Sequence, residues 1–171
     1  MELYFLRHGI AAERDCPKYK IDSTRPLTVQ GKRKMRICAR GMQALGLSFD
    51  TILCSPYVRA KQTARIVVGV FSLKESKINF TDTLVPEAPV ERLLQEIQTR
   101  FPKASSILLV GHEPHLTGCI AFLLNKAKPV CINLKKGGLC HLTLSSTERT
   151  NASLNWLLTP SQLCLIDPTA I

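Results

Sequence analysis

Short apolar runs alternate along the chain with longer stretches in which apolar residues recur every three or four positions. The runs ELYFL (2–6), TILCS (51–55), INF (78–80) and SILLVG (106–111) are typical of buried strands, and the periodic stretches between them are typical of amphipathic helices. LCHLTLSS and ASLNWLL, joined by the polar ERTN, predict a closing antiparallel hairpin. This alternation predicts a three-layer α/β/α fold with a mostly parallel central sheet.

Capping residues predict where the helices begin. Thr28 can cap a helix that ends at Gly46. Ser55-Pro56 predicts the N-cap and first turn of a second helix. Further helices are expected from about Val90 to Phe101 and over 115–124. The predicted apolar faces of the first two helices are Met35, Cys38, Ala39, Met42 and Leu45, and Ala60, Ala64, Val67 and Phe71.

Length and composition predict a single domain over residues 1–171, with 45% hydrophobic and 21% charged residues. Apolar runs fall short of the roughly 18 to 20 residues that span a membrane, and the start lacks the features of a signal peptide, so we expect a cytoplasmic protein without a membrane partner. The seven cysteines show no metal-ligand spacing, which predicts free thiols in a reducing compartment and no metal site.

A formal net charge of +10 predicts an attraction for anions. Nucleic acid is a poor candidate, because aromatic residues make up only 6% of the chain and are not interleaved with the basic residues. The basic stretch GKRKMRICAR (31–40) has the pattern of a solvated helix face. Phosphorylated substrates and acidic proteins remain the better candidates.

Three predicted strands end in residues that can bind an anion. The first ends at Arg7-His8-Gly9, the second is followed within a turn by Arg59, and SILLVG is followed by His112. Because parallel strands bring their carboxyl ends to one edge of a sheet, and two of these ends open helices, the arrangement predicts a phosphate pocket. Arg25 in STRPLT is a fourth candidate, with an ordinary loop arginine as the alternative.

The motifs that carry these residues resemble those of the histidine phosphatase superfamily, which has the phosphoglycerate-mutase-like fold, and within it the branch of short phosphohistidine phosphatases. The matching segments are LRHG, TRPLTVQG, SPYVRAKQTA, VGHEPHLTG, KKGGLCHLTL and NWLLTP, in that order over nearly the whole chain. The resemblance implies that His8 is a nucleophile that becomes phosphorylated. It implies that Arg7, Arg25 and Arg59 bind phosphate and that His112 binds the transferring group.

Phosphoryl transfer is compatible with these residue types, because it mainly requires that the reacting groups are positioned and that positive charge surrounds the phosphoryl oxygens. Attack requires a neutral imidazole, and neighbouring arginines disfavour the imidazolium form of His8. Water would then hydrolyse phospho-His8, and we expect neither a metal nor a cofactor to be needed.

One departure from the superfamily pattern concerns the general acid. Many members use a glutamate in the loop after the second helix, whereas here the loop reads DTLVPEAPVE, with Pro86 about where that glutamate is expected and Glu87 only a loose match. Glu87 is either a proton donor or a solvated loop carboxylate. Weak acid assistance favours a phosphohistidine substrate, because imidazole leaves readily near neutral pH.

The sequence therefore predicts a metal-independent protein histidine phosphatase that removes phosphate from a phosphotransfer domain. The short loop before the third helix predicts an open pocket, and the basic surface would attract an acidic partner. The alternatives are a small-molecule phosphomonoesterase and a basic anion- or nucleic-acid-binding module without catalysis. Lys135 and Lys136 are interpreted as edge-strand solubility residues, with an approach to the phosphate as the alternative. His115 and His141 are interpreted as structural and Trp156 as a core residue.

Overall fold

The computed structural model describes residues 1–125, 130–145 and 152–167. Its sheet has six strands in the order β3-β2-β4-β1-β5-β6. The strands are β1 (Glu2–Arg7), β2 (Thr51–Cys54), β3 (Ile78–Phe80), β4 (Ser106–Gly111), β5 (Leu139–Leu144) and β6 (Ala152–Leu158). The pairs β1–β4, β2–β4 and β2–β3 are parallel, whereas β5 runs antiparallel to both β1 and β6. The mostly parallel sheet and the closing antiparallel pair are confirmed, and the ERTN connection lies outside the described residues.

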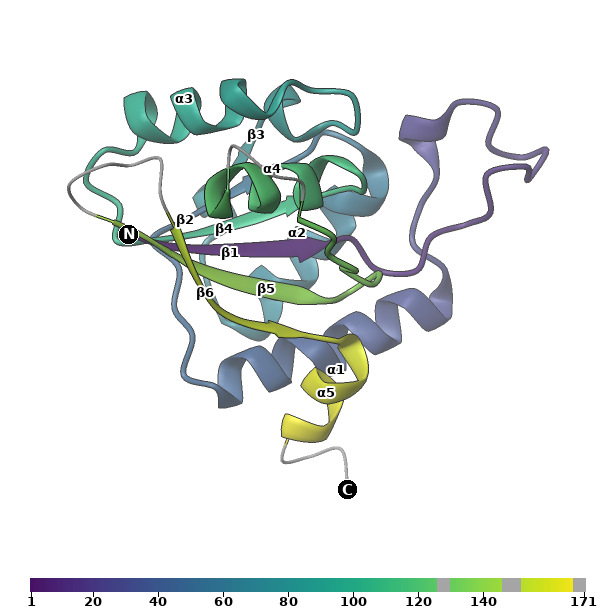
Figure 1. The fold of residues 1–171 in the computed structure, drawn as a ribbon. Coiled ribbons are helices and arrows are strands. Elements are labelled where there is room, and N and C mark those ends of the chain that lie inside the picture. Colours follow the sequence, from purple (N-terminus) through teal and green to yellow (C-terminus); the bar gives the residue numbers. More distant parts are fainter. Residues whose placement is uncertain (126–129, 146–151, 168–171) are drawn as a thin grey trace.

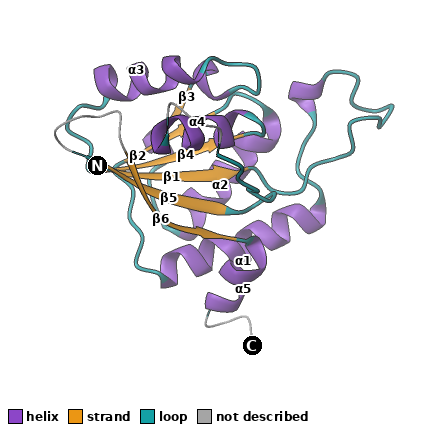
Figure 2. Ribbon diagram, in the orientation of Figure 1, coloured by secondary structure: helices purple, strands orange, loops and turns teal. Residues whose placement is uncertain are grey.

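Helices cover both faces of this sheet, which confirms the α/β/α prediction (Figures 1 and 2). The helices are α1 (Val29–Ala44), α2 (Val58–Val70), α3 (Val90–Arg100), α4 (His115–Leu124) and α5 (Pro160–Ile166). Short 3₁₀ turns lie at Asp22–Thr24 (η1), Glu75–Lys77 (η2) and Asp82–Leu84 (η3). In the part of the chain that the structure describes, no helix is long and apolar enough to cross a membrane.

Alternate residues of the central strands pack into two separate hydrophobic cores, because successive side chains of a strand point to opposite faces of the sheet. Tyr4 and Leu6 of β1 pack with α1, α2 and α5, whereas Leu3 and Phe5 pack with α3 and α4. Trp156 is only partly buried against the first of these cores. Both faces of β1 are therefore fixed, and the strand carries Arg7 and His8 rigidly to the carboxyl edge of the sheet.

Helix α1 begins as predicted, because the side chain of Thr28 accepts a hydrogen bond of 2.9 Å from the Gly31 N–H. Leu45 caps the other end and is 40% exposed, so it does not belong to the buried face. Gly46 follows with φ 71°, a left-handed conformation that glycine adopts without strain.

The predicted start of α2 was wrong. The helix begins at Val58 with Tyr57 as N-cap, and Ser55 lies before it with its hydroxyl 2.8 Å from the Nε2 atom of His112. Ser55 therefore supports the neighbouring strand end instead of capping the helix. At the other end Phe71 is the C-cap and packs, partly buried, against the core.

Candidate active site

The main chain around His8 is held from three directions. Its N–H donates to the Gly111 carbonyl of β4 at 3.1 Å, and the N–H of Gly137 lies 3.0 Å and 3.1 Å from the carbonyl oxygens of Arg7 and His8. The Gly9 N–H donates to Thr63 Oγ1 at 3.1 Å. A Cβ on Gly9 would lie 2.6 Å from the side chain of Met35, so this turn needs glycine for space. These contacts therefore fix the main chain from which the His8 imidazole extends.

The hydrogen bonds of His8 define its tautomer. Nδ1 lies 2.7 Å from the carbonyl oxygen of Gly9, which can only accept, and Arg59 Nε–H, which can only donate, points to Nε2 at 3.1 Å. The proton therefore sits on Nδ1, and Nε2 carries the lone pair. Burial, together with the charges of Arg59, Arg7 and Lys136, lowers the pKa of His8 from 6.5 to about 3. His8 is thus a neutral imidazole with a nucleophilic nitrogen directed at cationic side chains.

Asp22, a residue that the sequence motifs did not single out, binds two of the predicted phosphate ligands. Its Oδ1 accepts from Arg25 Nε and Nη2 at 2.9 Å and 2.6 Å, and its Oδ2 accepts from Arg59 Nη2 at 2.8 Å. The Asp22 carbonyl accepts from Arg59 Nη1 at 2.7 Å, and the carbonyl of Ala12 accepts from Arg25 Nη1 at 2.6 Å. Burial raises the pKa of Asp22, but the hydrogen bonds from both arginines outweigh it and leave a value of about 2. The two guanidinium groups are therefore oriented by one carboxylate.

His112, at the end of β4, lies next to His8, with the two ring centroids 5.0 Å apart. Its Nε2 lies 2.8 Å from Ser55 Oγ, and its buried Nδ1 has no hydrogen-bond partner among the described residues. Burial, with the neighbouring His8 and Arg59, lowers the pKa of His112 to about 2. Both imidazoles are therefore neutral over the physiological range.

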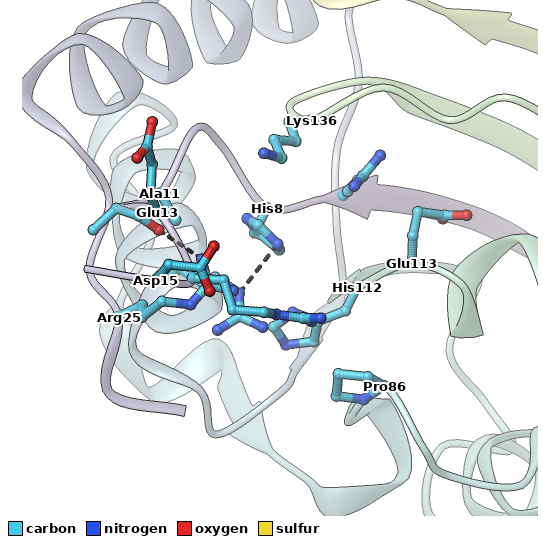
Figure 3. A pocket seen from close by; sticks show the side chains of 13 residues that line it. His8, Ala11, Glu13, Asp15, Arg25, Pro86, His112, Glu113 and Lys136 are labelled. Carbon is cyan, nitrogen blue, oxygen red and sulfur yellow. Dashed lines mark hydrogen bonds between the residues drawn. The ribbon is translucent and has the colours of Figure 1, made fainter. Parts of the chain in front are cut away.

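The side chains of His8, Arg25, Arg59 and His112 line one cavity of about 420 Å³. Figure 3 shows the imidazole of His8 between Lys136 and His112, with Pro86 at the opposite wall. The cationic lining residues are Arg7, Arg14, Arg25, Arg59 and Lys136, and the acidic ones are Glu13, Asp15 and Glu113. The structure thus brings Arg7, His8, Arg25, Arg59 and His112 together, whereas Glu87 is absent from the described lining and Pro86 takes that wall. This cavity can hold an anion against a neutral nucleophile.

The interpretation of Lys135 and Lys136 as edge-strand residues was wrong. They precede β5, which is an inner strand, and Lys136 lines the cavity while Gly137 beside it adopts φ 82°. The KKGG pattern was the signal for this turn, since paired glycines permit a main chain to approach a site closely.

Glu113, directly after His112, is a second residue that the sequence analysis missed. Burial raises the pKa of its carboxyl group, even though Thr117 Oγ1 donates to Oε2 at 2.5 Å. Its Oε1 is buried without a hydrogen-bond partner in the described part of the chain. In Figure 3 the carboxylate points away from His8.

The remaining histidines lie outside this cavity. His115 is buried in α4 with its ring 3.6 Å from Cys119 Sγ, and His141 stacks on Tyr4 and contacts Glu2. Both positions agree with the structural interpretation. Within the described ranges, no group of three or more His, Cys, Asp or Glu side chains is placed to hold a metal ion.

Comparison with known proteins connects this geometry to a family. The model of the histidine phosphatase superfamily (branch 1) matches residues 3–84. An uncharacterised protein of Picosynechococcus sp. is 36% identical over 144 residues, covering 83% of this chain and 84% of that protein. The phosphohistidine phosphatase SixA of Escherichia coli is 27% identical over 164 residues, covering 95% and 96% of the two chains.

A solved structure shares the fold over nearly the same extent. The protein histidine phosphatase SixA complexed with tungstate superimposes with a TM-score of 0.82 at 27% identity, covering 95% of this chain and 99% of that one. Tungstate is a tetrahedral oxyanion, so that relative binds an anion with the shape of phosphate.

Proposed function

The chain belongs to the histidine phosphatase superfamily as a SixA-like phosphatase, and from this premise we propose that it hydrolyses phosphohistidine on a protein phosphotransfer domain through a phospho-His8 intermediate. The observation that carries the proposal is the unprotonated Nε2 of His8 in a cavity lined by five cationic side chains. A neutral nucleophile surrounded by fixed positive charge is what phosphoryl transfer requires of a protein.

The first half-reaction transfers the phosphoryl group to His8. The Nε2 lone pair attacks phosphorus as the substrate P–N bond breaks. The electron pair of that bond leaves with the substrate imidazole, whose other ring nitrogen carries a proton, so the leaving group is neutral imidazole and needs no acid from the enzyme. The Arg59 Nε–H, which donates to Nε2 in the free protein, turns to a phosphoryl oxygen. Arg7 and Arg25 bind the other oxygens, where they offset the charge of the transition state.

His112 completes the oxyanion site through Nδ1, which has no hydrogen-bond partner in the described part of the chain. When the Ser55 hydroxyl donates to Nε2, the ring proton sits on Nδ1, which becomes a neutral hydrogen-bond donor for a phosphoryl oxygen. In the second half-reaction water attacks phosphorus, the bond between phosphorus and His8 Nε2 breaks, and phosphate and the neutral imidazole are regenerated.

The leaving group supports phosphohistidine as the substrate class. Pro86 stands at the wall of the cavity where a loop acid would stand, and Glu87 does not line it. An imidazole leaving group tolerates this because its pKa lies near neutrality. The 27% identical relative from Escherichia coli is itself a phosphohistidine phosphatase.

The decisive experiment mixes the protein with a phosphohistidine-bearing phosphotransfer domain, measures phosphate release, and traps the enzyme without acid. We expect transient labelling of His8, and loss of both labelling and release in His8→Asn. The matched control is His141→Asn, which changes a histidine outside the cavity and should keep both activities. Phosphate release by His8→Asn at the wild-type rate would overturn the proposal.

A small-molecule phosphomonoesterase is the second candidate, and Glu113 is the observation that favours it. Its raised pKa makes it a carboxyl group able to carry a proton beside the cavity. The carboxylate points away from His8, so ester hydrolysis would need another rotamer, and phosphohistidine is the preferred substrate. Turnover of alkyl phosphates that is lost in Glu113→Gln, but kept in Glu87→Gln, would establish the second candidate instead.

A further inference from the structure

Two thiols that the proposed mechanism does not use face each other between α1 and α5. The Sγ atoms of Cys38 and Cys164 lie 3.7 Å apart, although the residues are separated by 126 positions in the sequence. Cys38 is buried and Cys164 is partly exposed. The Sγ atom of Cys38 also lies 3.6 Å from the carbonyl oxygen of Pro160, at the start of α5.

The two helices hold these thiols in a fixed relation. A Cβ on Gly41 would lie 2.0 Å from the carbonyl oxygen of Leu163, so the backbones of α1 and α5 are in direct contact. Leu163 is fully buried, and Arg40 Nε binds the Asp167 carboxylate at 2.7 Å. Since the S–S bond of a disulfide is about 2.05 Å long, the sulfur atoms need to approach by roughly 1.7 Å for the bond to form.

We propose that Cys38 and Cys164 are a redox-sensitive pair that a peroxide converts reversibly into a disulfide, which clamps α5 onto α1.

The partly exposed Cys164 is the site of the first step. Its thiolate attacks one oxygen of hydrogen peroxide, the O–O bond breaks, and the products are a sulfenic acid and hydroxide, which takes up the thiol proton to become water. The sulfur of Cys38 then attacks the Cys164 sulfur, the S–O bond breaks, and the hydroxyl leaves as water with the Cys38 proton. Two thiols and one peroxide give one disulfide and two waters, with both electrons supplied by the thiols.

The chemistry of the buried partner fits this order. Burial, followed by the neighbouring Cys164, raises the pKa of Cys38 to about 12, so its thiol resists direct oxidation by peroxide. Cys38 serves as the resolving group because its Sγ atom lies 3.7 Å from that of Cys164. The closed loop between the two cysteines contains β2 to β6, and long loops lose the most unfolded-state entropy on cross-linking. The disulfide should therefore stabilise the whole chain against unfolding.

The test treats the full chain with hydrogen peroxide and maps the products by mass spectrometry under non-reducing conditions. We expect the loss of two hydrogens, a cross-linked peptide pair that contains Cys38 and Cys164, and a higher melting temperature that a thiol reductant reverses. Cys16→Ser/Cys131→Ser is the matched control: it removes two thiols that are not fully buried and should keep the entire response.

Two variants separate the clamp from a general effect on folding. Cys164→Ser should fold with the wild-type melting temperature under reducing conditions but show no shift with peroxide, and Cys38→Ala should stop at the Cys164 sulfenic or sulfinic acid. A disulfide that maps to other cysteines, or a Cys38 thiol that stays free while Cys164 is overoxidised in the wild type, would overturn the proposal.

Discussion

At the scale of single residues, the site depends on one carboxylate that orients two cations. Asp22 accepts from Arg25 and Arg59, and Arg59 in turn donates to the nucleophilic nitrogen of His8. Without Asp22 the two guanidinium groups would repel each other and lose their common orientation. Asp22 is in this way a positioning residue for the nucleophile.

Substituting Asp22→Asn should lower kcat/KM of the phosphatase by about 10- to 100-fold, the equivalent of losing charged hydrogen bonds worth roughly 1.5–3 kcal/mol. Steady-state kinetics with a phosphohistidine substrate check this. Asp15→Asn is the matched control, because it removes a negative charge from the lining of the cavity itself. Equal losses in the two variants would mean that charge, and not the orientation of the arginines, matters.

The lowered pKa values of His8 and His112 also predict how stability depends on pH. Both imidazoles stay neutral in the folded protein down to about pH 3 or below, whereas the unfolded chain binds protons below about pH 6.5. Their contribution is thus fully present above pH 6.5 and is lost as the pH falls, by up to about 1.4 kcal/mol per pH unit for each histidine.

The free energy of unfolding, measured with urea between about pH 7 and pH 4, should therefore fall less steeply in His8→Asn than in the wild type. Asparagine does not titrate, so the contribution of His8 to the slope disappears. Parallel slopes for the two proteins would contradict the lowered pKa of His8.

At the scale of the elements, α5 depends on close contact with α1. Gly41→Ala places a methyl group against the Leu163 carbonyl and should destabilise the fold by about 2 kcal/mol or more. Gly69→Ala in α2 is the matched control, because a Cβ there meets nothing within 4 Å, and it should be neutral or stabilising by up to about 1 kcal/mol. Thermal and urea unfolding compare the two; a harmless Gly41→Ala would mean that the helices separate easily.

The elements themselves were largely predictable, because strands and helices differ in their apolar period. The exception is α5, which the analysis missed although Thr159 and Gln162 form a capping box around Pro160. At only seven residues it has too little periodicity to stand out, and it exists because Leu163 packs onto α1. Tertiary packing, and not the sequence of the helix alone, therefore stabilises α5.

The site was predictable where motif and strand end coincide, as at His8 and His112. Asp22 was missed because its contribution depends on a partner distant in sequence: its carboxylate binds Arg59, 37 positions away. Glu113 was missed because it stands out only through its burial, which no local pattern shows. Ser55 was misassigned for the same reason, because its serine-proline signal suits a helix cap, whereas the imidazole of His112 lies within hydrogen-bond distance of its hydroxyl.

At the scale of the whole molecule, the net charge of +10 should speed the encounter with an acidic phosphotransfer domain. The value of kcat/KM for that domain should fall with rising salt, because screening weakens the long-range attraction. Arg14→Glu at the cavity should reduce kcat/KM for that domain more than Lys103→Glu does. The second variant makes the same change of charge beside the N-terminal end of β1. Equal effects of the two variants would show that only the total charge acts.

The contact between Gly137 and the carbonyl oxygens of Arg7 and His8 has a consequence for synthesis on the ribosome. The N-terminal part of the chain, which emerges first, already contains His8, Arg59 and His112. Thr63 and Gly111, which hold part of the turn of the nucleophile, are also made early, but the Gly137 N–H that binds both carbonyl oxygens is made later, and β5 must then insert beside β1. A nascent chain should therefore remain unable to take up phosphate until the 135–144 segment has left the exit tunnel, which delays activity until the fold can close.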